Sequence, residues 1–448
     1  MGHHPILRTL SLAAALAGLI APAGRAETVR ITLADALAMA ERQSPDLAAA
    51  RAQAQAADQR AEAARRAGWP RLDLSVGGSY TDIPSAAFAH KLDSGEFKAG
   101  DFELSRLNDP AGIFHLGTTL AVEAPLDAFG KVQAGARQAS AGAKSAGAQV
   151  DEGILDLRLQ VAMAYHQAAL ARGALAATER ALAGSRARES DVEARVEGGA
   201  ALQAELLRAR ARRREREADL AERRGDLRTA SAALARALGA APGTVYEPAE
   251  DPSAPASMTG DLDSWTARAL KDRPLLAAMA ARTEAARWGL RGTERSRLPD
   301  LALWGQVQDN RVGGIGGGKR AGGAGVSLRW SAFDPARDSR RAAGEAEVQA
   351  AEARARAATD QIRLEVATAW DRAVAARERH AAAAGGSEEG REALRVVRER
   401  RLAGIATLTD ELETEAASLA AELQELRAAA DAAIADATLE RAAGGGKP

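Results

Sequence analysis

The fold is decided by the stretch Leu157-Arg-Leu-Gln-Val-Ala-Met-Ala-Tyr165, which returns later in the chain as Ile362-Arg-Leu-Glu-Val-Ala-Thr-Ala-Trp370. Matching motifs flank this pair in the same order. Gln43-Ser-Pro45-Asp-Leu47 returns as Asp272-Arg-Pro274-Leu-Leu276, and Arg195-Val-Glu-Gly198-Gly199-Ala-Ala-Leu202 returns as Arg401-Leu-Ala-Gly404-Ile-Ala-Thr-Leu408. Ordered self-similarity of this kind indicates an internal duplication. The chain is therefore expected to contain two copies of one structural unit.

Each copy shows the same succession of hydrophobic patterns, which predicts a short helix, a strand, a loop, a strand, a long helix, a tight turn and a returning helix. In the first copy these elements are expected over Leu33–Gly68, Arg71–Tyr80, His115–Glu123, Asp127–Ala194 and Ala201–Leu238. In the second they are expected over Leu262–Leu298, Asp300–Gln308, Gly325–Trp330, Pro335–Arg401 and Ala406–Ala443. We accordingly divide the mature chain into a first repeat (27–238), a Pro-rich linker that cannot be helical (239–260), a second repeat (261–443) and a flexible tail (444–448).

The long helices imply an extended helical structure. A helix over Asp127–Ala194 would be about 100 Å long at 1.5 Å per residue, and a rod of that length needs partners along its course. The short and returning helices of the same copy together match its length, so stacked end to end they can lie beside it. Ala and other small residues let neighbouring helices approach closely, which favours a tube wall in which each helix packs on both flanks.

The strands carry a membrane-facing pattern. Apolar residues alternate with polar ones in two of them, and the apolar set is Leu72, Leu74, Val76, Val326, Leu328 and Trp330. Each run approaches the roughly 9 to 11 residues that cross a bilayer obliquely. About four strands per chain cannot close a barrel, because an open sheet would leave unpaired backbone groups in lipid. Oligomerisation is therefore required.

The N-terminus predicts export. Arg8 precedes the apolar run Leu10–Ala23, and the segment ends in Gly24-Arg-Ala26, which is typical of a signal peptide over residues 1–26 with Glu27 as the first mature residue. The run is too short for a spanning helix, and no later segment offers the roughly 20 apolar residues that one needs. The sequence contains no cysteine, so neither a disulfide framework nor an acylated cysteine is expected.

Composition and motifs argue against other classes of function. The formal net charge is -1, from 60 basic and 61 acidic residues, so no global field attracts nucleic acid. The segment Gly313–Lys319 resembles a phosphate-binding loop in its glycines and lysine, but the next residue is Arg320 and not the Ser or Thr that would bind magnesium. There is no Gly-x-Ser-x-Gly motif, no cysteine nucleophile and no histidine pair at metal-ligand spacing. We predict no enzyme, and no catalytic, cofactor-binding or metal-binding residues.

These features together resemble the TolC family of outer-membrane efflux proteins. The resemblance rests on the order of elements, the Pro45 and Pro274 motifs, the Phe333-Asp334 turn into a long helix, and the run from Arg401 to Glu413. It implies a mostly α fold with a membrane β-barrel contribution. In that fold two tandem repeats, in a homotrimer, form a shared β-barrel above a long periplasmic α-helical barrel. The implied partners are a periplasmic adaptor protein, an inner-membrane pump and outer-membrane lipid, with no nucleic acid.

The predicted function is that of an outer-membrane channel subunit of a tripartite efflux or type I secretion system, a passive conduit with a periplasmic helical domain. A structural periplasmic coiled-coil protein is the alternative. It would explain the helices and the signal peptide, but not amphipathic hairpins at matching places in both halves. The segment Thr81–Phe114 departs from the family pattern, because it is longer than its Gly-rich counterpart Asn310–Ala324. We expect it to have an added role or to be partly disordered.

Two sets of residues are candidates for function. The turns at Arg195, Gly198, Gly199, Arg401 and Gly404 are expected to form the periplasmic tip that meets the adaptor, since glycine tolerates the left-handed geometry of a helix end.

The second set is the candidate gate. Asp410 and Glu413 lie three residues apart after the Gly404 turn, so both carboxylates lie on one helix face. In the family that the chain resembles, acidic residues at matching positions line the periplasmic constriction, although Glu413 is longer than the usual Asp. Threefold symmetry would turn each acid into a ring that favours cations. The alternative is an exposed acidic helix start, since Glu411 and Glu415 are also acidic.

Overall fold

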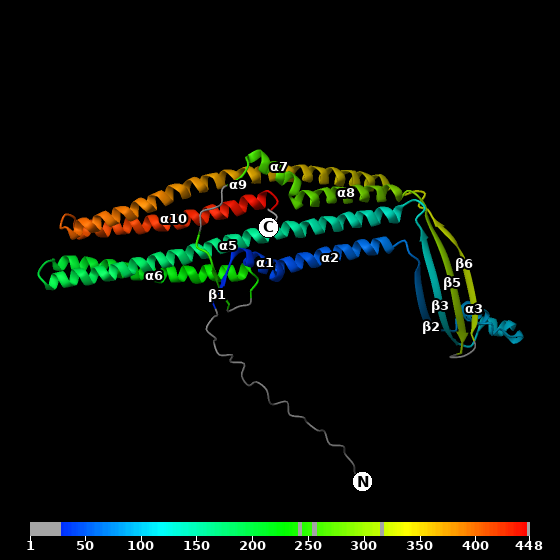
Figure 1. Ribbon diagram of the computed structural model, residues 1–448. Coiled ribbons are helices and arrows are strands. Elements are labelled where there is room, and N and C mark those ends of the chain that lie inside the picture. The colour runs from blue at the N-terminus through cyan, green and yellow to red at the C-terminus, as the bar shows by residue number, and fades with distance from the viewer. Residues whose placement is uncertain (1–27, 241–243, 253–257, 314–317, 446–448) are drawn as a thin grey trace, which may run out of the picture. The chain divides into compact units, whose positions relative to one another are not determined.

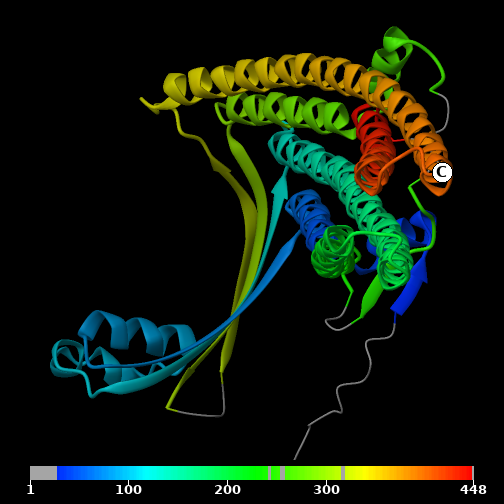
Figure 2. The same ribbon diagram turned by 90° about the vertical axis from the view of Figure 1, so that its left-hand side faces the viewer.

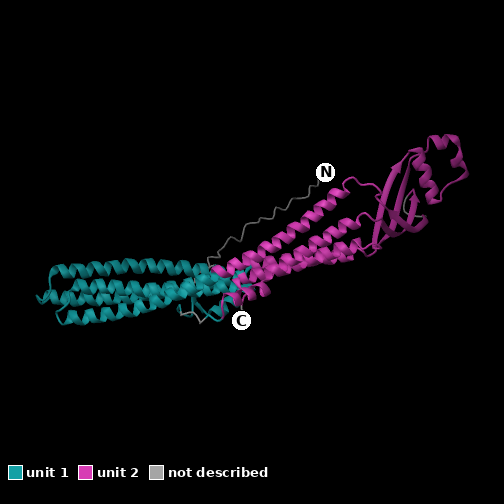
Figure 3. Ribbon diagram, turned by 90° about the horizontal axis from the view of Figure 1, so that it is seen from above, with its two compact units in different colours: residues 1–45, 156–259, 369–441 teal, residues 46–155, 260–368, 442–448 magenta. Residues whose placement is uncertain are grey.

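The computed structural model describes residues 28–240, 244–252, 258–313 and 318–445. The predicted signal peptide lies outside these ranges, as do parts of the predicted linker, of the Gly-rich loop and of the tail. The chain forms two compact units (Figure 3). Unit 1 comprises residues 1–45, 156–259 and 369–441, and unit 2 comprises 46–155, 260–368 and 442–448. Within the described ranges, no helix is long and apolar enough to cross a membrane.

Unit 1 is a helical bundle with a small sheet. It contains α1 (Leu33–Gln43), α6 (Gln203–Ala237) and α10 (Leu408–Ala442), together with the C-terminal parts of the long helices α5 (Lys131–Glu197) and α9 (Arg337–Leu402). Strand β1 (Thr28–Ile31) pairs in parallel with β4 (Val245–Pro248) (Figure 1). Strand β4 lies within the Pro-rich segment, which is therefore part of the folded unit at this point.

The core of unit 1 joins α1, α5 and α6. Val161, Tyr165 and Ala168 lie at the spacing of one helix face and pack against residues of the other elements. Those partners include Ala36, Ala40, Leu234, Leu238 and Tyr246. Tyr165, the last residue of the repeated stretch, is buried in this core. Alanines at the contacts allow close helix packing.

Unit 2 combines helices with a four-stranded antiparallel sheet in the order β2-β3-β5-β6. The strands are β2 (Arg71–Thr81), β3 (Ile113–Leu126), β5 (Asp300–Val312) and β6 (Lys319–Arg329), and they extend away from the helices of the same unit (Figure 2). These helices are α2 (Pro45–Arg66), α7 (Leu262–Asp272), α8 (Pro274–Arg295) and the N-terminal parts of α5 and α9. Among the described residues, β2 and β6 are edge strands.

The pairing register gives the sheet two different faces. Cross-strand partners share a face, and successive residues alternate between faces. One face carries Leu74, Leu120, Val307 and their apolar neighbours, which are largely exposed. The other face carries polar and small residues, among them Ser75, Thr119, Gln306, Gln308 and Ser327. The alternation predicted for the first and last strands is therefore confirmed.

The last strand is longer than predicted. Strand β6 begins at Lys319, whereas the sequence pattern suggested a Gly-rich loop as far as Ala324. Glycines have little intrinsic tendency to form strands, so their pattern was misleading. Here β5 pairs with them, and the Trp304 ring lies 3.6 and 3.1 Å from the positions that a Cβ would take on Gly323 and Gly325.

The polar segment between β2 and β3 is folded and not disordered. It contains α3 (Pro84–Ser94), the short 3-10 helix η1 (Ala99–Phe102) and α4 (Leu104–Asn108). We call residues 82–112 the insert.

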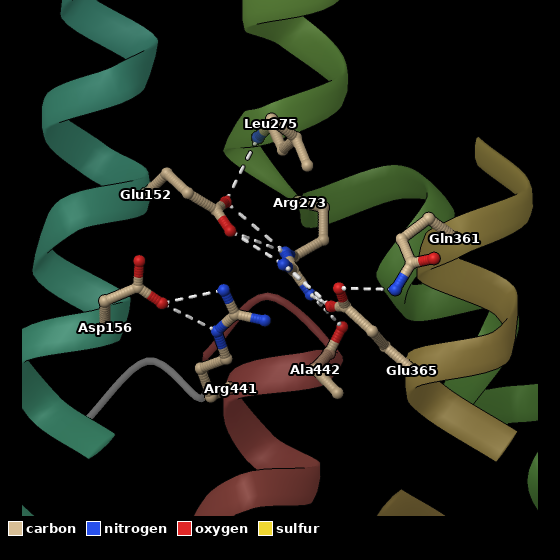
Figure 4. A network of polar contacts seen from close by, with 8 residues as sticks. All are labelled: Glu152, Asp156, Arg273, Leu275, Gln361, Glu365, Arg441 and Ala442. Atoms are coloured by element: carbon tan, nitrogen blue, oxygen red, sulfur yellow. Dashed lines mark hydrogen bonds and ion pairs between the residues drawn. The ribbon is translucent and has the colours of Figure 1, made fainter. Parts of the chain in front are cut away.

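Each Pro motif starts a helix, because proline lacks the amide hydrogen that a first helical turn leaves unused. Pro45 begins α2, and Pro274 begins α8 after Arg273. The Arg273 guanidinium is fully buried within unit 2, where it pairs with Glu152 at 2.7 Å and with Glu365 at 3.1 Å (Figure 4). It also donates to the Ala442 carbonyl at 2.9 Å. The first copy has Ser44 at this place, a residue that has no guanidinium.

Candidate functional site at the ends of the helical hairpins

The hairpins α5–α6 and α9–α10 each reverse through a left-handed glycine. Gly199 has φ 72° and Gly404 has φ 76°. In each turn the amide of the next residue donates to the carbonyl of Arg195 or Arg400, which closes the helix end. Gly198 still makes a helical hydrogen bond, so the left-handed residue that corresponds to Gly404 is Gly199. The repeated sequence motif had instead aligned Gly198 with Gly404.

The turns present exposed side chains. Arg195 is exposed, and three aliphatic residues around the turns are also largely open, namely Leu202, Leu402 and Ile405. Arg401 behaves differently, because its guanidinium turns toward the bundle and lies 3.1 Å from Asp191. Arg401 is therefore a predicted tip residue whose side chain already has an ion-pair partner within unit 1.

Behind the turns, the hairpins pack against each other. An apolar cluster draws on α5, α6 and α10 and consists of Val192, Leu206, Ala209, Leu408 and Leu412. This cluster fixes the positions of the turns relative to one another within unit 1.

A buried ion cluster lies next to these apolar residues. Arg188 on α5 has a side chain that is 5% exposed, and it pairs with Glu411 at 3.2 Å and with Glu415, both on α10. Arg398 lies 3.4 Å from Glu411, and Arg401 also contacts this carboxylate. Burial lowers the pKa of the Arg188 guanidinium, while the nearby Glu411 carboxylate opposes the shift. An arginine nevertheless stays charged at neutral pH. The cluster thus ties α5, α9 and α10 together near the hairpin ends.

The two candidate gate residues are outside this cluster. Asp410 accepts hydrogen bonds from the amide of Thr407 at 2.8 Å and from its hydroxyl at 2.7 Å, and its own amide donates to that hydroxyl at 3.2 Å. The arrangement is a capping box, and the Thr407 amide holds the pKa of Asp410 below its usual value. Glu413 is exposed on the same face of α10. In the single chain both carboxylates therefore point to solvent.

The sequence interpretation missed Arg188, Glu411 and Glu415 as a site. Glu411 and Glu415 were considered there only as part of an exposed acidic helix start, and this is wrong, since both are buried. A signal was present, because the two glutamates share a helix face with Leu408, Leu412 and Leu419. A charge within an apolar stripe indicates a buried partner of opposite charge.

Comparison with known proteins identifies the family. The sequence pattern of outer membrane efflux proteins matches residues 36–240 and 265–445. The chain belongs to the outer membrane efflux protein family. This is a family of transport channels and not of enzymes. The efflux function and the outer-membrane location predicted from the sequence are thereby supported. A sequence comparison with curated proteins gave no match.

Solved structures share the fold of this efflux protein. A membrane protein from Pseudomonas aeruginosa superimposes with a TM-score of 0.76 at 20% identity, over 92% of this chain and 93% of that chain. The outer membrane protein VceC from Vibrio cholerae gives 0.73 at 20% identity, over 92% and 96%. The open state of the MtrE outer membrane channel of Neisseria gonorrhoeae gives 0.73 at 20% identity, over 92% and 89%.

Proposed function

We propose that three copies of this efflux protein form one channel, which acts as the passive outer-membrane conduit of a tripartite efflux or type I secretion system. In this proposal the sheets join into one membrane barrel, and the helical hairpins form the periplasmic tube. A periplasmic adaptor and an inner-membrane pump deliver the cargo. The observation that carries the proposal is the open sheet of unit 2, which has an exposed apolar face and two free edges.

The strands have the dimensions of a membrane barrel. They contain 11, 14, 13 and 11 residues, and about 9 to 11 suffice to cross a bilayer obliquely. The edges β2 and β6 carry backbone groups without a partner in the described sheet, and such groups are too costly to leave in hydrocarbon. Pairing β2 of one copy with β6 of the next satisfies them. The apolar face then meets lipid and the polar face lines the pore.

We place the periplasmic constriction at Asp410 and Glu413. Both carboxylates are exposed at the start of α10, and the buried cluster beside them holds this helix to α5 and α9. Threefold symmetry would form two carboxylate rings, which favour cations. In the capping box, one oxygen of the Asp410 carboxylate accepts hydrogen bonds from Thr407. The Glu413 side chain therefore has the greater freedom to reach the pore axis.

We place the adaptor contact at the turns around Gly199 and Gly404. The exposed aliphatic side chains Leu202, Leu402 and Ile405 supply apolar area beside Arg195, which suits a protein partner.

The decisive experiment measures assembly and conduction together. The protein, extracted in mild detergent, should have the mass of a trimer and should form ion-conducting channels in planar bilayers. It should also sediment with outer membranes and resist extraction by salt. A monodisperse monomer that fractionates with soluble periplasmic proteins would instead support the structural coiled-coil alternative.

A further inference from the structure

The insert lies against one face of the sheet. The ring of His90 on α3 stacks on that of His115 on β3, with centroids 3.9 Å apart and planes 8° from parallel. The His115 Nε2 atom lies 3.3 Å from the Oδ1 atom of Asn310 on β5. At the end of α3, a Cβ on Gly95 would lie 3.6 Å from the Cβ of Lys319 on β6. Helix α3 also lies beside β5, so the insert contacts the three neighbouring strands β3, β5 and β6.

The register identifies this face as the polar one. Gly117 pairs with Asn310, and Asn310 pairs with Lys319, so these residues share a face with His115, two positions from Gly117. The same alternation places Thr119, Gln308 and Gln306 on this face, together with Trp304 and Val312, and places Leu120 and Val307 on the other.

The insert is at the end of the strands that is remote from the helices of unit 2 (Figure 2). It joins the last residue of β2 to the first residue of β3, whereas the opposite ends of these strands continue into α2 and α5. In the proposed channel this end is the outer mouth, and the polar face is the pore wall. The insert thus projects over the pore and not over the lipid surface.

The insert has a fixed shape of its own. Phe88, Phe97 and Phe102 form edge-to-face pairs, with centroids 4.5 Å apart for Phe88–Phe97 and 5.0 Å apart for Phe97–Phe102. Lys91 is 2.9 Å from Asp101 in a partly buried ion pair. A segment held by an aromatic cluster and an ion pair keeps its position better than an open loop, so it can restrict a passage.

We propose that the three inserts of the trimer form a constriction at the outer mouth of the channel, an inference that rests on the proposed function. Phe102 is 64% exposed and Leu104 is 75% exposed, although both belong to a folded segment. Since the inserts would lie over one pore, we assign the inserts of the neighbouring copies as the partners that cover these side chains. The exit is then narrowed by protein contacts that are separate from the periplasmic gate.

Labelling of a single thiol tests the constriction, because the natural sequence has no cysteine. Gln306→Cys places a thiol on the polar face, nearer the helices than the covered end. Small and polymer-linked maleimides are added outside intact cells, to the complete protein and to a variant in which a short Gly-Ser linker replaces residues 84–110. The small reagent should label both proteins. The large reagent should label the complete protein at least about tenfold more slowly than it labels the variant without the insert, since the diameter of the pore limits its entry.

A disulfide tests the docking independently. Gly95→Cys combined with Lys319→Cys brings the Cβ atoms to 3.6 Å, within the roughly 3.5 to 4.5 Å of natural disulfides. The pair should oxidise readily in membranes, and each single variant serves as the control. Gly95 has φ 71°, a backbone conformation that is strained for cysteine, so the substitution can disturb folding. The trimer content of the variant is therefore measured in parallel.

The outcomes separate this inference from the function on which it rests. Equal labelling by the large reagent with and without the insert, or no disulfide in an intact trimer, overturns the outer constriction alone. If even the small reagent cannot reach the thiol of Gln306→Cys in either protein, the polar face does not line a pore. That result would overturn the proposed channel function itself, and not only the outer constriction.

Discussion

Arg188→Met should loosen the hairpin ends of unit 1. Methionine keeps much of the length of the side chain but removes the charge that faces Glu411 and Glu415. Glu415 then loses the partner that it has in the structure, whereas Glu411 keeps Arg398 and Arg401. Removing one member of a buried ion pair costs about 3 to 5 kcal/mol, because the other charge remains buried. Since half of the cluster stays paired, we expect the lower end of this range, about 3 kcal/mol.

Hydrogen exchange at the facing turns of α5 and α10 measures this loss in the assembled protein. A local loss of about 3 kcal/mol raises the exchange rate of amides that open with the hairpin ends roughly a hundredfold, since 1.4 kcal/mol is a factor of ten. Combining Arg188→Met with Glu415→Gln should recover part of the protection, because the uncompensated charge is then removed as well. No recovery would mean that packing, and not charge, holds the helices.

Arg180→Met provides the matched control. Arg180 also joins α5 to α10, through Glu422 at 2.7 Å, but its side chain is 65% exposed. An exposed pair contributes at most about 1 kcal/mol, so exchange should rise no more than roughly fivefold. If the Arg188 and Arg180 variants change exchange by the same factor, the reasoning from burial is refuted.

Three further predictions concern the turns, the insert and the gate. Gly404→Val should cost about 1 to 2 kcal/mol through its left-handed backbone and reduce efflux, whereas Gly198→Ala should leave efflux unchanged, as antibiotic or metal tolerance of cells would report. Burial lowers the pKa of His90, the charge of His115 lowers it further, and Asp93 opposes both effects. His90 therefore binds a proton more readily when the insert is undocked than when it is docked. Docking is thus favoured above the ordinary pKa of about 6.5 and lost as the pH falls below it. Labelling of Gln306→Cys by the large maleimide, relative to the variant without the insert, should therefore accelerate from pH 7.5 to 5.5, and His90→Phe should remove this dependence. Asp410→Ala with Glu413→Ala should abolish cation selectivity in planar bilayers, and an unchanged reversal potential would exclude these residues as the gate.

Those features that follow from periodic patterns were predictable. Alternation in Leu72, Leu74 and Val76 fixed both the strand and its exposed face, because side chains on a strand alternate strictly. The long helices were predicted nearly to their ends, since Ala-rich sequence with few breakers continues until Gly199 or Gly404 stops it. These are local effects that a single sequence records.

Features that depend on distant partners were not predictable. Nothing near Arg188 in the sequence shows that Glu411 and Glu415 will enclose it, because the three residues belong to helices far apart in the chain. The insert is a second example. Its composition is polar enough to suggest disorder, yet the stacking of His90 on His115 and contacts with β5 and β6 give it a fixed position.

The two hairpins show why the duplication remained visible while their charges diverged. With Gly199 aligned on Gly404, Glu193 corresponds to Arg398 and Arg210 corresponds to Glu415. The first hairpin pairs Glu193 with Arg210 at 2.7 Å, an acid on α5 and a base on α6, whereas the second places its bases on α9 and its acids on α10. The reversed charges do not form the same pair, because Arg398 pairs with Glu411 and Glu415 pairs with Arg188. Arg188 on α5 pairs with Glu411 and Glu415 on α10, which couples the first hairpin to the second. Packing is not conserved at every position either, since the buried Leu206 of the first hairpin corresponds to the buried Glu411 of the second. The turn glycines Gly199 and Gly404 do correspond, because turn geometry restricts these positions to glycine, and they are among the positions by which the repeat is recognised.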